Sequence, residues 1–215
     1  MYDANIPVND KLSAMPKHNF DITKGSQEVF RLLMDALANP ARPVNLNDQI
    51  SQFVSNGKWL APALTLLDNE TGFFWDGPSE LEEEIHFLTG AMQVPPESAD
   101  FIFLSSSYVN TEPEAARLFA ERIISCVKAG THRDPHDSVM IFIASSGKTD
   151  ISISVSGPGV PPEGRKAQIS AAEAEWIKAR DKQQFEYPRG VELVFIRDDN
   201  SFLAITRKVA VKWLM

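Results

Sequence analysis

The sequence predicts a three-layer α/β/α sandwich around a mixed β-sheet, and three observations support this fold class. The runs at 101–104 and 139–144 are entirely apolar, as in strands that are buried on both faces. Apolar residues at helical spacing alternate with these runs along the chain, which is typical of helices packed on a central sheet. A hairpin pattern at 191–205 adds antiparallel pairing and makes the predicted sheet mixed.

The first half of the chain alternates predicted helices and strands. Apolar residues recur at helical spacing from Phe30 to Leu37, which predicts a helix from a cap at Ser26 to just before Pro40. The acidic segment ELEEE favours a helix N-terminus through the helix dipole, and Gly90 provides its end. The elements predicted here are helices at 26–38, 60–67 and 80–89 and strands at 73–75 and 101–104.

The second half continues the alternation and closes with a hairpin. Ser170 and Glu173 match a capping box, which predicts a helix that runs to about residue 183. Ile151, Ile153 and Val155 alternate with polar residues, as in a half-exposed strand. The elements predicted here are helices at 113–128 and 170–183 and strands at 139–144, 151–155, 191–196 and 202–205.

Length and composition predict one soluble domain at 20–215 that follows a polar tail at 1–19. A chain of 215 residues with 43% hydrophobic residues can bury roughly 70% of its unfolded surface. The tail has no apolar segment of the kind that a secretory signal requires, and no run is long enough to cross a membrane. The single cysteine, Cys126, is predicted to pack in the core, and we expect a cytoplasmic location.

Charge argues against a nucleic-acid partner. The formal net charge is −8, from 29 acidic and 21 basic residues, and the basic residues do not cluster. Such a surface repels a phosphate backbone.

Two motifs resemble known sites but lack part of the pattern. The segment SSGKTD at 145–150 resembles the end of a phosphate-binding loop, but an alternating strand follows it instead of a helix, which favours a hairpin turn. His132 and His136 are spaced like metal ligands, but Pro135 prevents the helix that would bring them onto one face. We therefore predict a polar loop, with Arg133 inside it, and no metal.

A rigid turn and a group of serines complete the candidates from the residues alone. SGPGVPPEG at 156–164 could present backbone N–H groups to an anion, with Gly157 and Gly159 at its centre, although a tight connection is the plainer interpretation. The serines at 105–107 follow an apolar strand, where α/β folds often bind ligands, but no nucleophile-elbow pattern surrounds them. The residues by themselves show no intact catalytic signature.

Six short segments carry a resemblance to a known family. They are FRLLMDALANPARPVNL at 30–46, LTLLDNETGFFW at 64–75, FLTGA at 87–91, VSGPGV at 155–160, PRGVELVFI at 188–196 and LAITR at 203–207. Together they span most of the sequence after about residue 20, and in this order they resemble the PhnH family, a subunit of the carbon–phosphorus lyase core complex. Arg189 and Arg207 lie in two of these segments and join the candidate ligand or partner residues.

The resemblance implies a fold like the large domain of pyridoxal-phosphate (PLP)-dependent transferases, without PLP or any other cofactor. It also implies assembly with PhnG, PhnI and PhnJ partners, and a homodimer when the chain is made alone. With these partners, the family supports transfer of the ribose-triphosphate part of ATP onto an alkylphosphonate, with release of adenine. The resemblance therefore implies a non-catalytic or auxiliary subunit, and it transfers no catalytic residue.

Two other interpretations stay open. The chain could be a stand-alone enzyme, either a diverged PLP-fold protein or a phosphate-ester transferase that uses the 132–137 loop. A PLP enzyme needs a Schiff-base lysine with an acidic partner, and Lys148 in its turn lacks that setting. A pure scaffold is the third interpretation, in which the chain contributes to assembly and not to chemistry.

Overall fold

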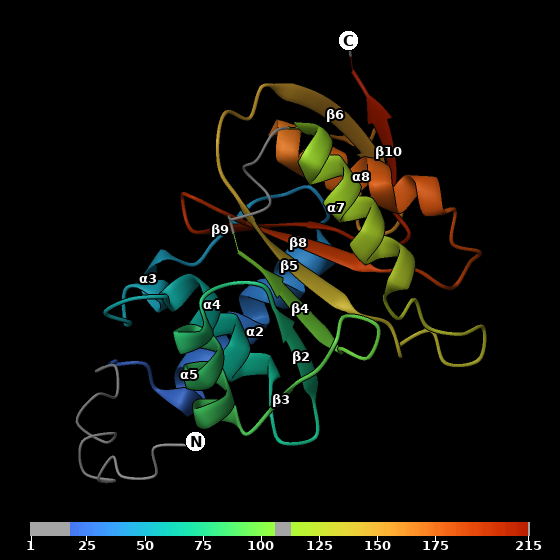
Figure 1. Ribbon diagram of the computed structural model, residues 1–215. Coiled ribbons are helices and arrows are strands. Elements are labelled where there is room, and N and C mark those ends of the chain that lie inside the picture. The colour runs from blue at the N-terminus through green and yellow to red at the C-terminus, as the bar shows by residue number, and fades with distance from the viewer. Residues whose placement is uncertain (1–17, 106–112, 215) are drawn as a thin grey trace, which may run out of the picture.

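The structure is a computed structural model that describes residues 18–105 and 113–214. This part of the chain contains six helices and ten strands, labelled as in Figure 1. The helices are α2 (Ile22–Ala38), α3 (Asn47–Ile50), α4 (Gly57–Leu66), α5 (Ser79–Thr89), α7 (Pro113–Cys126) and α8 (Ala171–Gln183). The strands are β1 (Val44–Asn45), β2 (Gly72–Trp75), β3 (Met92–Gln93), β4 (Phe101–Leu104), β5 (Met140–Ser145), β6 (Ile151–Ser156), β7 (Arg165–Ile169), β8 (Glu192–Arg197), β9 (Ser201–Ile205) and β10 (Ala210–Trp213).

A seven-stranded mixed sheet forms the centre, in the order β1-β9-β8-β5-β4-β2-β3. Strands β3, β2, β4, β5 and β8 run parallel, whereas β9 pairs antiparallel with β8 and β1 pairs antiparallel with β9. The predicted mixed α/β sheet is confirmed. The hairpin at the end of the chain is also confirmed, because β8 and β9 are neighbours in the sheet.

Each face of this sheet is covered by its own hydrophobic core. Ile141 and Ile143 of β5 join the core that contains α7 and α8, whereas Phe142 and Ala144 join the core that contains α2, α4 and α5. This alternation follows from the strand period of two residues. Figure 1 shows the two groups of helices on opposite sides of the sheet, so the sheet lies between two helical layers.

A second sheet, in the order β10-β6-β7, was not predicted from the sequence. It packs on the α7 and α8 side, where Ile153 and Val155 of β6 and Ile169 of β7 enter that core. Strand β6 therefore does not pair with β5, and the prediction of a hairpin turn at 145–150 is wrong. That segment connects one sheet to the other.

The helix boundaries are explained by their caps. Helix α2 begins earlier than predicted, because Asp21 and not Ser26 accepts hydrogen bonds from the N–H groups of Thr23 and Lys24, at 2.9 and 3.0 Å. The predicted capping box of Ser170 with Glu173 is present at α8. Gly90 ends α5 in the left-handed conformation, as predicted.

One prediction of burial is wrong. Cys126 is exposed, because it is the last residue of α7 and lies outside the face that Ala116, Ala120 and Ile123 turn to the core.

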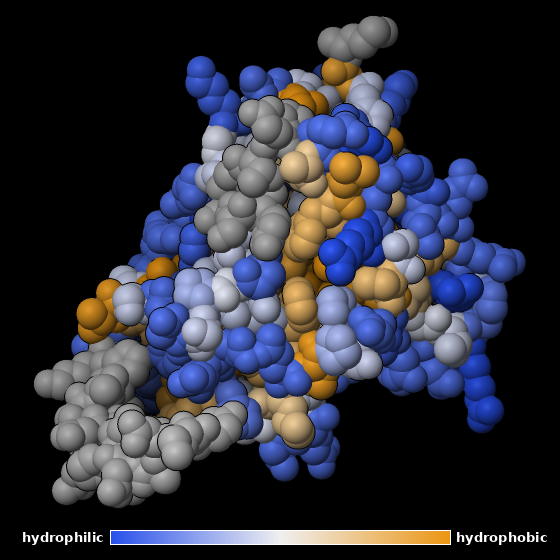
Figure 2. All heavy atoms as spheres, viewed as in Figure 1, coloured by the Kyte–Doolittle hydropathy of each residue, from blue (hydrophilic) through white to orange (hydrophobic). Residues whose placement is uncertain are grey.

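Most of the face drawn in Figure 2 is hydrophilic, with a narrow hydrophobic stripe through its middle.

Within 18–105 and 113–214, no helix is long and apolar enough to span a membrane. Most of the polar tail predicted at 1–19 lies outside the described residues.

Candidate functional site

A groove lies at the amino-terminal edge of the parallel strands. It consists of two cavities of about 410 and 610 Å³ that share lining residues, so they are continuous. The floor is apolar and includes Phe101 and Met140, the first residues of β4 and β5. The end of α2 forms one wall through Met34 and Leu37. The shared lining is Leu37, Ala38, His136, Glu192, Thr206 and Arg207.

Arg207 holds the opposite wall together. Its Nε donates to the Glu192 carboxylate, its Nη1 to the Pro135 carbonyl and its Nη2 to the Ser138 hydroxyl. The Arg207 backbone N–H also donates to Glu192 Oε2, at 2.9 Å. The guanidinium thus ties the end of β9 to the start of β8 and to the 135–138 loop, and its Nε and both terminal nitrogens are already engaged.

The segment that carries Arg207 is held from its other side by Arg180 of α8. The Arg180 side chain is buried and donates to the carbonyls of Thr206 and Val209, at 3.0 and 3.1 Å. Asp181 pairs with the same guanidinium at 2.6 Å. Arg180 therefore fixes the backbone that follows β9 and carries Arg207.

The glycine-rich turn packs against this wall because its glycines allow close approach. A Cβ on Gly159, which has φ of 77°, would lie 2.1 Å from the Ala38 carbonyl oxygen at the end of α2. A Cβ on Gly157, which has φ of 132°, would lie 2.8 Å from the carbonyl oxygen of Lys208. Only glycine accommodates both the positive φ and the contact.

The predicted site residues divide into two groups. His136, Gly159 and Arg207 line the groove, and Gly157 adjoins it through Lys208. The second group, His132, Arg133 and Arg189, is exposed on the neighbouring loops. Sequence reasoning thus proposed residues that share one region, although not one centre.

The two histidines have different carboxylate neighbours. His132 Nε2 lies 3.5 Å from Glu186, and His136 Nε2 lies 3.5 Å from Asp137. Arg189 donates from Nε to the Gly130 carbonyl at 3.3 Å, which ties its loop to the start of the 130s loop. Among the residues that the structure describes, no group of three or more His, Cys, Asp or Glu is arranged to hold a metal ion.

A second polar site lies at the carboxyl ends of β2 and β4, where sequence reasoning considered the serines after β4 but missed Asp76 after β2. Asp76 follows β2 and accepts a hydrogen bond from the backbone N–H of Ser105, the residue after β4. Burial raises the pKa of Asp76 to about 6, and its Oδ2 is buried without a hydrogen-bond partner among the described residues. An acidic residue directly after an apolar strand was the signal available in the sequence. Ser106 and Ser107 lie outside the described residues.

The order of the strands explains why the position of Asp76 matters. From β2 the chain passes through α5 to β3 on one side, whereas from β4 it passes through α7 to β5 on the other. The two helices lie on opposite faces, so β2 and β4 flank the switch point of the sheet. Open α/β sheets often bind ligands at such a point.

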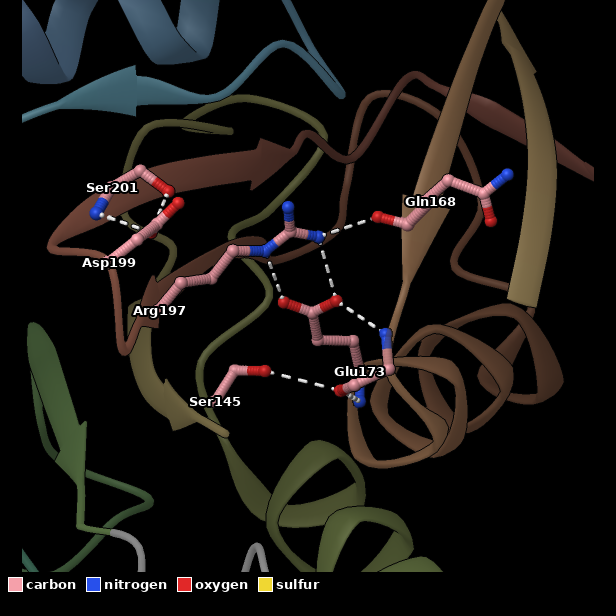
Figure 3. A network of polar contacts seen from close by, with 7 residues as sticks. Ser145, Gln168, Glu173, Arg197, Asp199 and Ser201 are labelled. Atoms are coloured by element: carbon pink, nitrogen blue, oxygen red, sulfur yellow. Dashed lines mark hydrogen bonds and ion pairs between the residues drawn. The ribbon is translucent and has the colours of Figure 1, made fainter. Parts of the chain in front are cut away.

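A third polar group near this edge has a structural role (Figure 3). Glu173 is fully buried and pairs with Arg197 at the end of β8 through two hydrogen bonds, of 2.8 and 2.9 Å. Glu173 Oε2 also accepts from the Ser170 backbone N–H at 2.8 Å, and the Ser170 hydroxyl lies 3.2 Å from that of Ser145. These groups satisfy one another and hold α8 to the sheet.

The shape and lining of the groove are suited to binding. Its floor is apolar, and its most buried charged pair, Glu192 with Arg207, is engaged within the chain. A concave apolar surface with a few fixed polar groups recognises a ligand or a protein segment by shape.

Comparison with known proteins agrees with the resemblance seen in the sequence. A search of curated proteins found no match. A family model described as "Bacterial phosphonate metabolism protein (PhnH)" matches residues 19–212, which is nearly the whole chain and includes the groove and the switch point. The chain therefore belongs to the PhnH family of bacterial phosphonate metabolism proteins.

Proposed function

We propose that this chain is a subunit of the carbon–phosphorus lyase core complex. It supports transfer of the ribose-triphosphate part of ATP onto an alkylphosphonate, with release of adenine. The observation that carries this proposal is the family match over residues 19–212, which supports a role in bacterial phosphonate metabolism. PhnG, PhnI and PhnJ proteins are the partners, and the cytoplasm is the proposed compartment.

The geometry supports an auxiliary and not a catalytic part in that complex. Arg207 lines the groove together with Lys208, and the side-chain nitrogens of Arg207 already donate to Glu192, Pro135 and Ser138. A rigid subunit can still raise the rate of a partner, because a displacement of about 1 Å in a catalytic site can cost about a hundredfold. The mixed sheet between two helical layers supports the proposed relation to the large domain of PLP-dependent transferases.

The test is co-expression of this chain, carrying an affinity tag, with the PhnG, PhnI and PhnJ proteins of the same operon. The proposal expects all four to co-purify, and expects adenine release from ATP and methylphosphonate to depend on this chain. An isolated chain is expected to sediment as a homodimer and to release no adenine. Failure to co-purify, or equal adenine release without this chain, would contradict the proposal.

One observation favours a second candidate, a transferase that acts alone. Asp76 is a buried carboxyl group with a raised pKa at the switch point of the sheet, and perturbed groups of this kind concentrate at active sites. If this second function is correct, the isolated chain should show turnover, and Asp76→Asn should abolish that turnover. An isolated wild-type chain without turnover would reject this alternative.

A further inference from the structure

The groove continues into an exposed apolar stripe on α2. Phe30 and Met34 are one helical turn apart and are 48% and 47% exposed, and Leu37 and Ala38 continue the stripe into the groove. Positions i, i+4, i+7 and i+8 share one side of a helix. From Phe30 to Ala38 the stripe is about 12 Å long, at 1.5 Å per residue, which matches two turns of another helix.

Most charges beside the groove are paired within the chain: Asp35 with Arg42, Glu192 with Arg207, and Asp100 with Lys128 at 2.6 Å. At the rim, Asp137 and His136 lie 3.5 Å apart and are mostly exposed. Lys208 also lines the groove, is exposed and has no acidic partner among the described residues, and its Nζ lies 3.5 Å from the Tyr187 hydroxyl. The surface is therefore apolar with one unpaired cation at its border, and a complementary segment needs apolar side chains and an acidic residue beside Lys208.

The wall of the groove is fixed before anything binds. Arg207 holds the 135–138 loop through Pro135 and Ser138, and Gly159 packs on the end of α2. A preformed site loses little conformational entropy on binding, which favours affinity.

We propose that an amphipathic helix of a partner subunit docks on this surface. Its apolar face lies along Phe30 and Met34, and its large side chains enter the groove over Phe101 and Met140. This mode is helix-in-groove recognition, in which anchors at i, i+3 or i+4 and i+7 fill an apolar cleft. The inference rests on the proposed function, because it assigns the surface through which the chain joins its complex.

A second copy of the chain is a poorer occupant. A groove needs an apolar ridge to fill it, and the other exposed large apolar residues of the described chain form no second stripe at helical spacing. The other exposed residues are Ile22, Val54, Phe87, Met92, Leu118, Tyr187 and Trp213.

The first test identifies the occupant by photo-crosslinking. The photoreactive residue p-benzoylphenylalanine replaces Met34 in the tagged chain, which is co-expressed with the PhnG, PhnI and PhnJ proteins. The sample is then irradiated, and the crosslinked peptides are identified by mass spectrometry. We expect crosslinks to a helical peptide of one partner. The control carries the same probe at Leu118, an exposed residue of α7, which packs on the opposite face of the sheet from α2. This probe should not label that peptide. Crosslinks from position 34 only to residues 1–17 of this chain, or only to a second copy, would overturn the assignment.

The second test removes the apolar stripe. Phe30→Glu with Met34→Glu alters two half-exposed side chains, so the fold should persist, whereas co-purification should fall about tenfold or more. Leu118→Glu is the matched control and should co-purify as the wild type does. If the double variant assembles normally, the inference fails while the proposed function stands. If the wild-type chain itself does not assemble, both fail.

If the isolated double variant becomes monomeric while the wild type is dimeric, the stripe is a self-interface and the partner assignment is overturned. A thermal melt of the isolated variants keeps loss of binding separate from loss of fold.

Discussion

Replacing Arg207 with alanine is expected to destabilise the protein severely. The Arg207 and Glu192 side chains are only 14% and 17% exposed, so the substitution leaves a nearly buried carboxylate without its cation. Removal of one partner of a buried ion pair lowers the free energy of unfolding by about 3–5 kcal/mol. Because both side chains keep some exposure to solvent, we expect a loss near the lower end of that range. For a chain of this length, about 3 kcal/mol corresponds to a fall in Tm of roughly 6–12 °C.

The assay is urea unfolding of the purified chain, with two comparison variants. Arg42→Ala breaks the pair with Asp35, whose side chains are 47% and 43% exposed, and should cost at most about 1 kcal/mol. Arg207→Met combined with Glu192→Leu removes both charges and should be more stable than Arg207→Ala. If the free energy of unfolding of Arg207→Ala is within about 1 kcal/mol of the wild-type value, Arg207 does not hold the groove wall.

Three further predictions concern other positions. Gly159→Ala should lose about 1–3 kcal/mol more than Gly147→Ala, because a Cβ at 159 meets the Ala38 carbonyl whereas one at 147 meets nothing within 4 Å; equal unfolding free energies would contradict this. The folded pKa of Asp76 is raised to about 6, so the folded state binds more protons than the unfolded state between about pH 4 and 6 and loses stability as pH rises through that range. The difference in unfolding free energy between Asp76→Asn and the wild type should therefore grow in favour of the variant, by on the order of 2 kcal/mol, between about pH 4 and pH 7. A difference that does not change with pH would contradict the raised pKa of Asp76. The purified protein should show no Schiff-base absorbance band, because Lys148 is exposed on its turn, and a stoichiometric band that Lys148→Ala removes would overturn that prediction.

The central sheet could be predicted because its strands have strong local signals. The apolar runs at 101–104 and 139–144 became β4 and β5, each within a residue of its predicted bounds. The second sheet could not be predicted in the same way. Strand β7 reads RKAQI and β10 has mostly exposed residues, so neither shows an apolar alternation. Strand β7 follows β6 closely in the sequence, whereas the pairing of β10 with β6 joins residues that are far apart in the chain.

The candidate site was predicted in part. His136, Gly159 and Arg207 were singled out from loop composition and from the family resemblance, and the structure brings them to one groove. The sequence contained no sign of the partners of Arg207, because Pro135 and Ser138 lie about seventy residues earlier in the chain. Asp76 was missed because its importance depends on which strands flank the switch point, and strand order is a property of the fold.

The most direct test of the proposed function is growth on a phosphonate. A bacterium that uses this operon, with the gene for this chain deleted and the rest of the operon intact, is supplied with methylphosphonate as its only phosphorus source. The account predicts no growth on methylphosphonate, normal growth on phosphate, and restored growth on methylphosphonate when the wild-type chain is supplied from a plasmid. Normal growth of the deletion strain on methylphosphonate would contradict the claim that this chain is an obligatory subunit.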